Sequence, residues 1–241
     1  MQLDAVLATL SLGPVGISDG LAQTDVGLIS QAFRCAADST LLRPSRPLST
    51  VDSAFANRSV GTLSLDVRAT HATVGEATTH HVVVWRTTVP VTLQPTDLYP
   101  APSLRRTRLA VRRHVLTPGD AQFHGCEEGQ PAAPTCVQVL PRGTLPVLPP
   151  TGGADANFSL TAIFESLSNG AFFLGELSKF VHTAPQRFEA VRVAAGAECG
   201  LAVVVKGAVG EVVRVAAVDP SGRVRLKSVV IPGVGRIEVH I

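Results

Sequence analysis

The stretch LAVVVKGAVGEVVRVAAV, residues 201–218, decides the fold class of this chain. Two valine-rich runs flank a turn that contains Gly207 and Gly210. β-Branched residues fit the pleated, half-buried surface of a strand, and glycine adopts the backbone conformations that tight turns require. The stretch therefore predicts two short strands that follow each other closely.

Similar segments lie on both sides of this stretch. They are TLSLDVRA (62–69), HHVVVWRT (80–87), RLAVRRHVL (108–116), NFSLTAIFE (157–165), NGAFFLGEL (169–177), RVRLKSVVI (223–231) and RIEVHI (236–241). Repeated short strands between glycine, proline and asparagine turns are typical of an antiparallel sandwich or barrel. We therefore predict a mainly β chain, with an antiparallel β-sandwich over residues 56–241. Residues 117–153 are rich in glycine and proline and predict a long loop within it.

The N-terminal part has a different pattern, which predicts one β-strand followed by one α-helix over residues 1–55. The apolar run VLATLSLGPVGIS (6–18) predicts a buried strand, and TDVGLISQAFRCAAD (24–38) has apolar residues at helical spacing. Thr24 or Asp25 is the expected N-cap. A single βα unit does not cover its own apolar faces. We therefore expect this unit to be poorly anchored by itself and to need a sheet or barrel to join, which would be supplied by a longer protein.

Composition excludes several classes of function. The chain of 241 residues is 45% hydrophobic and 17% charged, with a formal net charge of +2, so no nucleic-acid partner is expected. No apolar run reaches the roughly 20 residues that a membrane span needs. The first ten residues lack a basic start and contain Asp4, which argues against a signal peptide. If this chain is part of a longer protein that is secreted, we expect the signal peptide of that protein to precede Met1.

Secretion would bear on four further residues. Asn57 and Asn157 each begin a glycosylation acceptor triplet. Cys126 and Cys136 flank the polar, proline-containing segment EEGQPAAPT, which a disulfide would close. Closing such a loop would stabilise the fold by about 3 kcal/mol. Two unpaired thiols are the alternative.

Three motifs in the N-terminal part resemble one group of glycoside hydrolases. The chain reads SLGPVGISD at 11–19, DSTLLR at 38–43 and TVDSAF at 50–55. The α-galactosidase and raffinose synthase group carries approximately SGGPVYVSD, DGSILR and TxD(S/C)LF in the same order and at similar spacing. Leu12 and Ser39 stand where the group has glycine, and Gly16 stands where it has an aromatic residue.

This resemblance implies a particular place in a larger enzyme. In that group a (β/α)8 barrel precedes an antiparallel β-domain, so residues 1–55 would be the last βα unit of the barrel. Ser18 and Asp19 would end its last strand, where they would contact the sugar; alternatively, Asp19 only caps the following turn. The group's two catalytic carboxylates lie on earlier barrel strands, which have no counterpart here.

The function expected from these observations is that of an accessory β-domain in a glycoside-hydrolase-like protein. The chain alone should hydrolyse no glycoside, and we expect no catalytic residue, metal or cofactor within it. The expected partners are the rest of the barrel and carbohydrate. The alternative is a standalone β-sandwich module that binds carbohydrate or protein, which exposed aromatic residues on one sheet face would favour.

A few ring side chains deserve separate predictions. His80 and His81 are adjacent in an expected strand, so their side chains should point to opposite faces and should not chelate one metal together. Trp85 and Tyr99 are candidates for stacking on a sugar ring. A single tryptophan in a strand is more often part of the core, and we expect that of Trp85.

Overall fold

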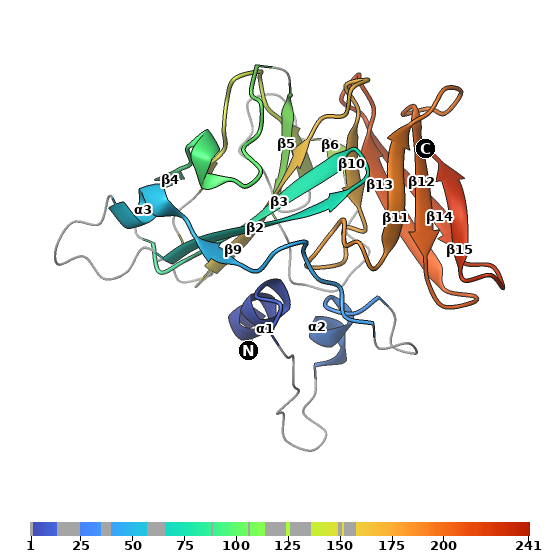
Figure 1. Ribbon diagram of the computed structural model, residues 1–241, viewed down its shortest axis with the longest axis horizontal. Helices are drawn as coiled ribbons and strands as arrows, with labels where there is room; N and C mark the ends of the chain where they lie inside the picture. Colours follow the sequence, from blue (N-terminus) through green and yellow to red (C-terminus); the bar gives the residue numbers. More distant parts are fainter. Residues whose placement is uncertain are drawn as a thin grey trace.

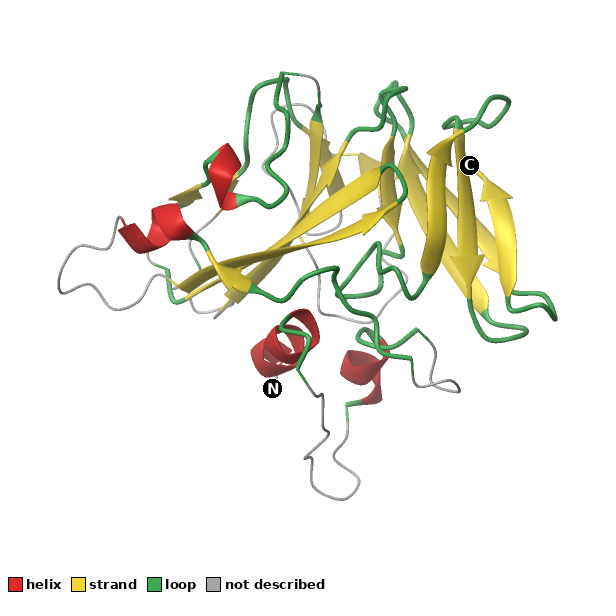
Figure 2. Cartoon of the chain, viewed as in Figure 1, coloured by secondary structure: helices red, strands yellow, loops and turns green. Residues whose placement is uncertain are grey.

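The computed structural model describes ten segments of the chain. These are residues 2–13, 25–34, 40–56, 66–87, 89–105, 107–113, 124–125, 136–148, 151 and 158–241. They form a mainly β fold with antiparallel sheets, as the sequence predicts, and the helices are short and peripheral (Figure 2). No helix within these segments combines the length and the apolar character that a membrane crossing requires.

The largest sheet contains seven strands. Their order across the sheet is β1 (Ser49–Thr50), β2 (Asp66–Val74), β3 (Ala77–Trp85), β9 (Phe158–Glu165), β5 (Leu109–Arg113), β7 (Cys136–Val139) and β6 (His124–Gly125). Neighbouring strands are antiparallel except for β6 and β7, which are parallel. The long strands β2, β3 and β9 cross the centre of the molecule (Figure 1). Residues on their two faces belong to two different hydrophobic clusters, so this sheet is covered on both sides.

Two three-stranded antiparallel sheets form the C-terminal side of the molecule. One contains β10 (Phe172–Gly175), β13 (Val212–Val218) and β14 (Val224–Val230), and the other contains β11 (Phe188–Val193), β12 (Leu201–Lys206) and β15 (Arg236–His240). Apolar side chains of both sheets share one hydrophobic cluster, in which the rings of Phe173 and Phe188 meet edge to face at 5.0 Å. The other side of β10 and β13 packs with Phe164 of the large sheet. The three sheets are therefore joined by continuous apolar packing.

The strands confirm the predictions for the C-terminal half and correct the predicted loop. All segments predicted as strands after residue 156 contain one in the structure. Within the expected loop of residues 117–153, however, β6 and β7 extend the large sheet. The short β8 (Val147–Leu148) pairs there with β4 (Val91–Thr92). These strands are two to four residues long, and such short pairings give too few alternating positions to be recognised in a sequence rich in glycine and proline.

The N-terminal segment begins with a helix, so the predicted strand is wrong over residues 6–10. Helix α1 (Gln2–Leu10) has Leu3, Val6, Leu7 and Leu10 on one face, at helical spacing. Val6 and Leu10 are fully buried in a cluster with Trp85 and other residues of the large sheet. Since this sheet covers the apolar face of α1, the prediction of a poorly anchored N-terminal segment is also wrong.

The second helix starts where the sequence predicts but ends early. Asp25 is its N-cap, and its side chain accepts a hydrogen bond from the Leu28 N–H at 2.9 Å. The helix, α2 (Val26–Ser30), contains five residues, whereas the sequence predicts continuation to residue 38. Its last carbonyls bind other groups: Lys179 Nζ donates to Ser30 O at 2.7 Å, and the Phe180 N–H donates to Gln31 O at 3.0 Å. These contacts with a distant loop replace the next helical turn.

Two further helical elements lie beside the large sheet. They are α3 (Asp52–Ala56) and the 3-10 helix η1 (Pro95–Asp97). In Figure 1, α3 lies at the end of the large sheet that is far from the C-terminus, whereas α1 and α2 lie below the sheet. The large sheet is therefore partly enclosed by helices.

Residues 176–187, here called the linking loop, connect the N-terminal helices with all three sheets. The loop follows Gly175, whose φ is +72°; a Cβ there would lie 2.0 Å from His182 O, so the tight approach requires glycine. The Glu176 N–H donates to this same carbonyl at 2.8 Å. At the other end of the loop, the Lys206 N–H of β12 donates to Arg187 O at 2.7 Å. The loop is therefore fixed at both ends by backbone hydrogen bonds.

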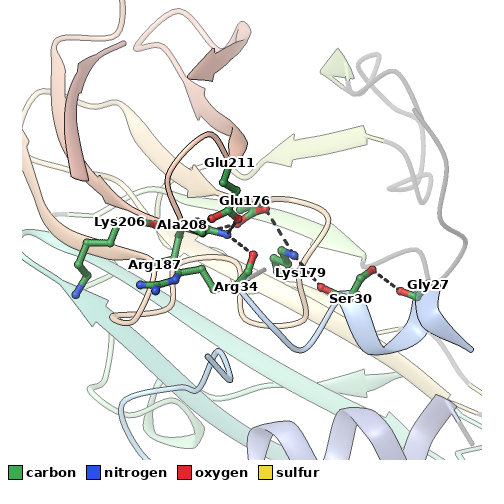
Figure 3. Close-up of polar contacts among 9 residues, drawn as sticks. All are labelled: Gly27, Ser30, Arg34, Glu176, Lys179, Arg187, Lys206, Ala208 and Glu211. Carbon is green, nitrogen blue, oxygen red and sulfur yellow. Dashed lines mark hydrogen bonds and ion pairs between the residues drawn. The ribbon is translucent and has the colours of Figure 1, made fainter. Parts of the chain in front are cut away.

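Arg187 is the centre of the polar contacts in this loop (Figure 3). Its guanidinium is fully buried and pairs with two carboxylates: Nε lies 2.8 Å from Glu176 Oε2, and Nη2 binds Glu211 Oε1. Nη1 donates to Lys206 O at 2.7 Å, and Nη2 also donates to Arg34 O. A buried cation is tolerated when its donors are satisfied and countercharges are close. One side chain thus connects the N-terminal segment, the linking loop and the C-terminal sheets.

We predict that Arg187→Met destabilises the chain strongly. Removing the guanidinium leaves Glu176 and Glu211 near each other without their main cation, and burial already raises the pKa of Glu176 against the opposing effect of Arg187. Breaking a buried pair in this way costs about 3–5 kcal/mol of unfolding free energy, which urea denaturation measures.

The matched control is Arg192→Met. Arg192 also pairs with a glutamate, at 2.7 Å, but its side chain is 57% exposed. Losing an exposed pair costs about 0–1 kcal/mol. Equal losses for the two variants would contradict the role given to Arg187.

Candidate functional site

A hollow of about 400 Å³ lies on one face of the large sheet, beside η1. It is lined by Arg46, Pro47, Ser49, Ala69, Thr70, His71, Asp97 and Tyr99. Three parts of the chain supply these residues: the segment that follows α2, strand β2, and the turn around η1. The sheet provides a rigid floor, and the two other segments provide the walls.

An exposed aromatic ring forms one wall of the hollow. Tyr99 has 59% of its surface exposed, although it is a large ring at the edge of a packed region. The Arg46 guanidinium carbon lies 4.3 Å from the centre of this ring, within the range of a cation–π contact. The Thr70 hydroxyl donates to the Arg46 carbonyl and so holds the Arg46 backbone against β2. The guanidinium therefore covers part of one face of the ring, and more than half of the Tyr99 surface stays open to solvent.

A carboxylate with a fixed orientation faces the same hollow. Asp97 accepts hydrogen bonds from the Ser53 hydroxyl at 2.6 Å and from the Gln94 N–H at 2.6 Å. The Ser53 N–H is a third donor, at 3.3 Å. These contacts come from α3 and from the start of η1, so the carboxylate cannot rotate freely. A carboxylate oxygen can accept more than one hydrogen bond, so Asp97 can still bind a hydroxyl group of a ligand.

His71 forms part of the floor of the hollow. Its ring centre lies 5.5 Å from that of Tyr99, and burial lowers its pKa, with the charges of His80 and Arg46 acting in the same direction. Behind it, His80 Nε2 lies 2.9 Å from Glu165 Oε1. A neutral histidine offers one donor and one acceptor to a ligand. The hollow therefore combines an aromatic ring, a guanidinium over that ring, one carboxylate, and neutral hydrogen-bonding groups.

The polar residues of this hollow can be compared with the requirements of glycoside hydrolysis. Glycoside hydrolysis generally needs two carboxyl groups on either side of the scissile bond. Asp97 is the one carboxylate among the residues that line the hollow. An aromatic surface with neighbouring polar groups instead matches a ligand that has both apolar C–H faces and hydroxyl groups.

Most site residues predicted from the sequence lie outside the described residues. This applies to Ser18, Asp19, Asn57, Cys126 and Asn157, and the side chain of Cys136 is not described either. Their roles stay predictions.

The ring residues can be compared with their predictions. Trp85 is 8% exposed and belongs to a hydrophobic cluster, which confirms its place in the core. Tyr99 is exposed and remains a candidate for stacking. The sequence analysis missed Arg46 and Asp97, because they lie in turns without a motif and meet Tyr99 only in the fold.

No protein-family model matches the chain, and no curated protein sequence is significantly similar to it. The resemblance to glycoside hydrolases therefore rests on the three N-terminal motifs alone.

The opposite face of the large sheet holds a buried basic cluster under the linking loop. His81 stacks on His182 with ring centres 5.6 Å apart, and the His182 N–H donates to His81 Nε2 at 3.4 Å. Arg112 Nη1 lies 2.7 Å from His182 Nε2; since a guanidinium can only donate, that nitrogen accepts. His80 and His81 thus contact different residues on different faces, as strand alternation predicts.

The neutral form of His81 is strongly favoured in the fold. Burial lowers its pKa from 6.5 to about 3, and the charges of His80 and His71 act in the same direction. Burial also lowers the pKa of Arg112, to about 10, so Arg112 keeps its charge at neutral pH. Protonation of His81 would therefore place a charge at a fully buried position.

We predict that His81 makes the fold less stable as the pH falls from about 6.5 towards 3. The unfolded chain binds a proton with a pKa of 6.5, whereas folded His81 stays neutral, so the unfolded state gains protons first. Between about pH 7.5 and about pH 5 the loss from one such group is about 2 kcal/mol of unfolding free energy.

Urea unfolding at both pH values tests this expectation. His81→Gln should remove about this much of the pH dependence, whatever it does to stability at neutral pH. His240→Gln, at an exposed position, is the control for replacing a histidine by glutamine, and its pH dependence is to be compared with that of His81→Gln. An unchanged pH dependence in His81→Gln would show that this group is not the source.

Proposed function

We propose that the chain is the accessory β-domain of a glycoside-hydrolase-like protein, that it contacts carbohydrate at the Tyr99 hollow, and that it has no complete active site of its own. The observation that carries the binding proposal is the exposed Tyr99 ring, flanked by Arg46 and by the oriented Asp97 carboxylate. The relation to glycoside hydrolases is supported by the motifs at residues 11–19, 38–43 and 50–55.

The chemistry of sugars fits this hollow. One face of a pyranose ring presents C–H groups, which pack on an aromatic ring, while its hydroxyl groups require donors and acceptors. Asp97 can accept hydrogen bonds from hydroxyl groups, and Arg46 can donate them. Ser49 and Thr70 add hydroxyl groups to the lining. A neutral sugar would meet both its apolar and its polar requirements there.

In this proposal the rest of a (β/α)8 barrel is the partner of the N-terminal segment. The third motif, residues 50–55, runs through β1 and α3, beside the hollow. Ser53 within this motif binds Asp97. The part of the chain that resembles the enzyme family therefore supports the proposed sugar-contact residues directly.

The second candidate is a standalone β-sandwich module that binds carbohydrate or protein. Its specific support is the position of α1 and α2, which bury Val6, Leu10 and Leu28 against the large sheet. The helices α1 and α2 therefore cover apolar side chains of the large sheet, so that this face does not require a barrel to cover it. Both candidates use the same hollow, so a binding experiment applies to each.

We predict that Tyr99→Ala weakens sugar binding and that Tyr99→Phe retains it. The alanine variant loses the flat ring, whereas phenylalanine keeps the ring and loses only the hydroxyl. Stacking on an exposed ring is worth about 0.5–1.5 kcal/mol, so the expected loss in affinity is roughly threefold to tenfold. Isothermal titration calorimetry with galactose, raffinose and longer galactosides measures it.

The exposed position of Tyr99 should leave folding intact in both variants, which circular dichroism checks. Arg236→Ala, another exposed position, is the matched control and should bind as the original chain does. If Tyr99→Ala bound these sugars as well as Tyr99→Phe, or if the original chain bound none of them, the proposal would be wrong.

A further inference from the structure

A second hollow, of about 410 Å³, lies at the start of β5 and is separate from the Tyr99 hollow. It is lined by Thr107, Arg108, Arg142, Ser166, Leu167, Ser168, Asn169 and Gly170. Three segments meet there: the residues before β5, the turn after β7, and the turn between β9 and β10. None of these residues belongs to the lining of the Tyr99 hollow.

The charged residues that line this hollow are all basic. Its lining contains two arginines, Arg108 and Arg142, and no aspartate or glutamate. Arg108 is half-buried and Arg142 is exposed. Among the residues that the structure describes, neither guanidinium lies within ion-pair distance of a carboxylate, whereas the half-buried Arg225 pairs with Asp219. Two cations around one hollow repel each other, and an anion between them would remove that cost.

The backbone holds Arg108 in a fixed position. The Arg108 N–H donates to Ser166 Oγ at 3.0 Å, and the Ser166 N–H donates to Arg108 O at 2.9 Å. This reciprocal pair ties the start of β5 to the end of β9. Because Ser166 Oγ accepts from the backbone, its own O–H can donate into the hollow.

The two turns at the rim are fixed as well. In the turn that carries Arg142, the Thr144 hydroxyl donates to Pro141 O at 2.6 Å. In the other turn, Asn169 Nδ2 donates to the carbonyls of Cys199 and Gly200, and the Ala171 N–H donates to Asn169 Oδ1. A site whose backbone is held in place loses little entropy when a ligand binds.

We propose that this hollow binds a phosphate or sulfate group. The two guanidinium groups offer paired N–H donors, and the hydroxyl groups of Thr107, Ser166 and Ser168 offer further donors from other directions. Donors distributed in this way fit a tetrahedral oxyanion better than a planar carboxylate, which one guanidinium fork satisfies. The group is either a free anion or part of a larger ligand such as a sugar ester.

The test is a titration of the ¹⁵N-labelled chain with inorganic phosphate, glucose 6-phosphate and glucose, followed by NMR. The amide signals of Ser168 and Gly170 report on the hollow. For these two signals we expect saturable shifts with both phosphates at concentrations up to about 10 mM and no shift with glucose, because the contacts in this hollow are mainly ionic. Equal affinities would indicate a free anion, and tighter glucose 6-phosphate binding would indicate an anionic group on a larger ligand; both results support an oxyanion site.

Arg108→Gln and Arg142→Gln should each weaken phosphate binding about tenfold, since each variant loses charge-assisted hydrogen bonds to the anion. Arg223→Gln removes the same charge at an exposed position outside the hollow and should leave the affinity nearly unchanged. The remaining signals of the spectrum show whether each variant is folded.

Three results would overturn the proposal. The first is the absence of saturable shifts at Ser168 and Gly170 with either phosphate. The second is unchanged phosphate affinity in the double variant of Arg108 and Arg142. The third is an equal loss of affinity in Arg223→Gln, which would indicate a general charge effect. Ser168 and Gly170 line this hollow and not the Tyr99 hollow, so the outcome at their signals is independent of the sugar-binding proposal.

Discussion

The buried guanidinium of Arg187 is the contact on which the arrangement of the chain depends. It binds Glu176 of the linking loop, Glu211 just before β13, and the backbone carbonyls of Lys206 and Arg34. These partners come from parts of the chain that are far apart in sequence. A buried charge without such partners would be costly, so the fold is favoured only when all of these parts are assembled around it. The linking loop thereby joins the N-terminal segment to the C-terminal sheets.

This assembly also determines the candidate sugar site. Arg46 follows α2 in the chain, and α2 is held by Lys179 and Phe180 of the linking loop. Strand β2 lies beside this segment, and there the Thr70 hydroxyl donates to the Arg46 carbonyl. The aromatic and cationic surface is thus formed by a loop residue of the N-terminal segment and a loop residue near η1, both held against one sheet. The hollow around Arg108 and Arg142 has a similar basis, since each of its two turns and the start of β5 is fixed by a hydrogen bond between a side chain and the backbone.

The sequence predicts the β class and most long strands, because valine-rich runs such as residues 201–206 and 212–218 are separated by glycine turns. The prediction is wrong for α1. The apolar run 6–18 predicts a strand, but its first residues also have helical spacing, and in the structure the large sheet covers that face of the helix. The length of α2 is also set by the linking loop, about 150 residues further along the chain. Of the candidate site, only Tyr99 can be singled out from sequence. Arg46, Asp97 and the two-arginine hollow lie in turns, and long-range packing brings their side chains together.

The central claim is that the linking loop makes the N-terminal segment part of one cooperative structure. Native-state hydrogen exchange tests it most directly, since it gives an opening free energy for each amide. The account predicts nearly equal opening free energies for two groups of amides. The first group is Leu10 in α1 and the linking-loop contacts Phe180 and Lys206, and the second group is Val83 and Val203 in the sheets. Opening free energies for Leu10 and Phe180 that are several kcal/mol lower than those for Val83 and Val203 would contradict the account, because the N-terminal segment would then be only loosely attached.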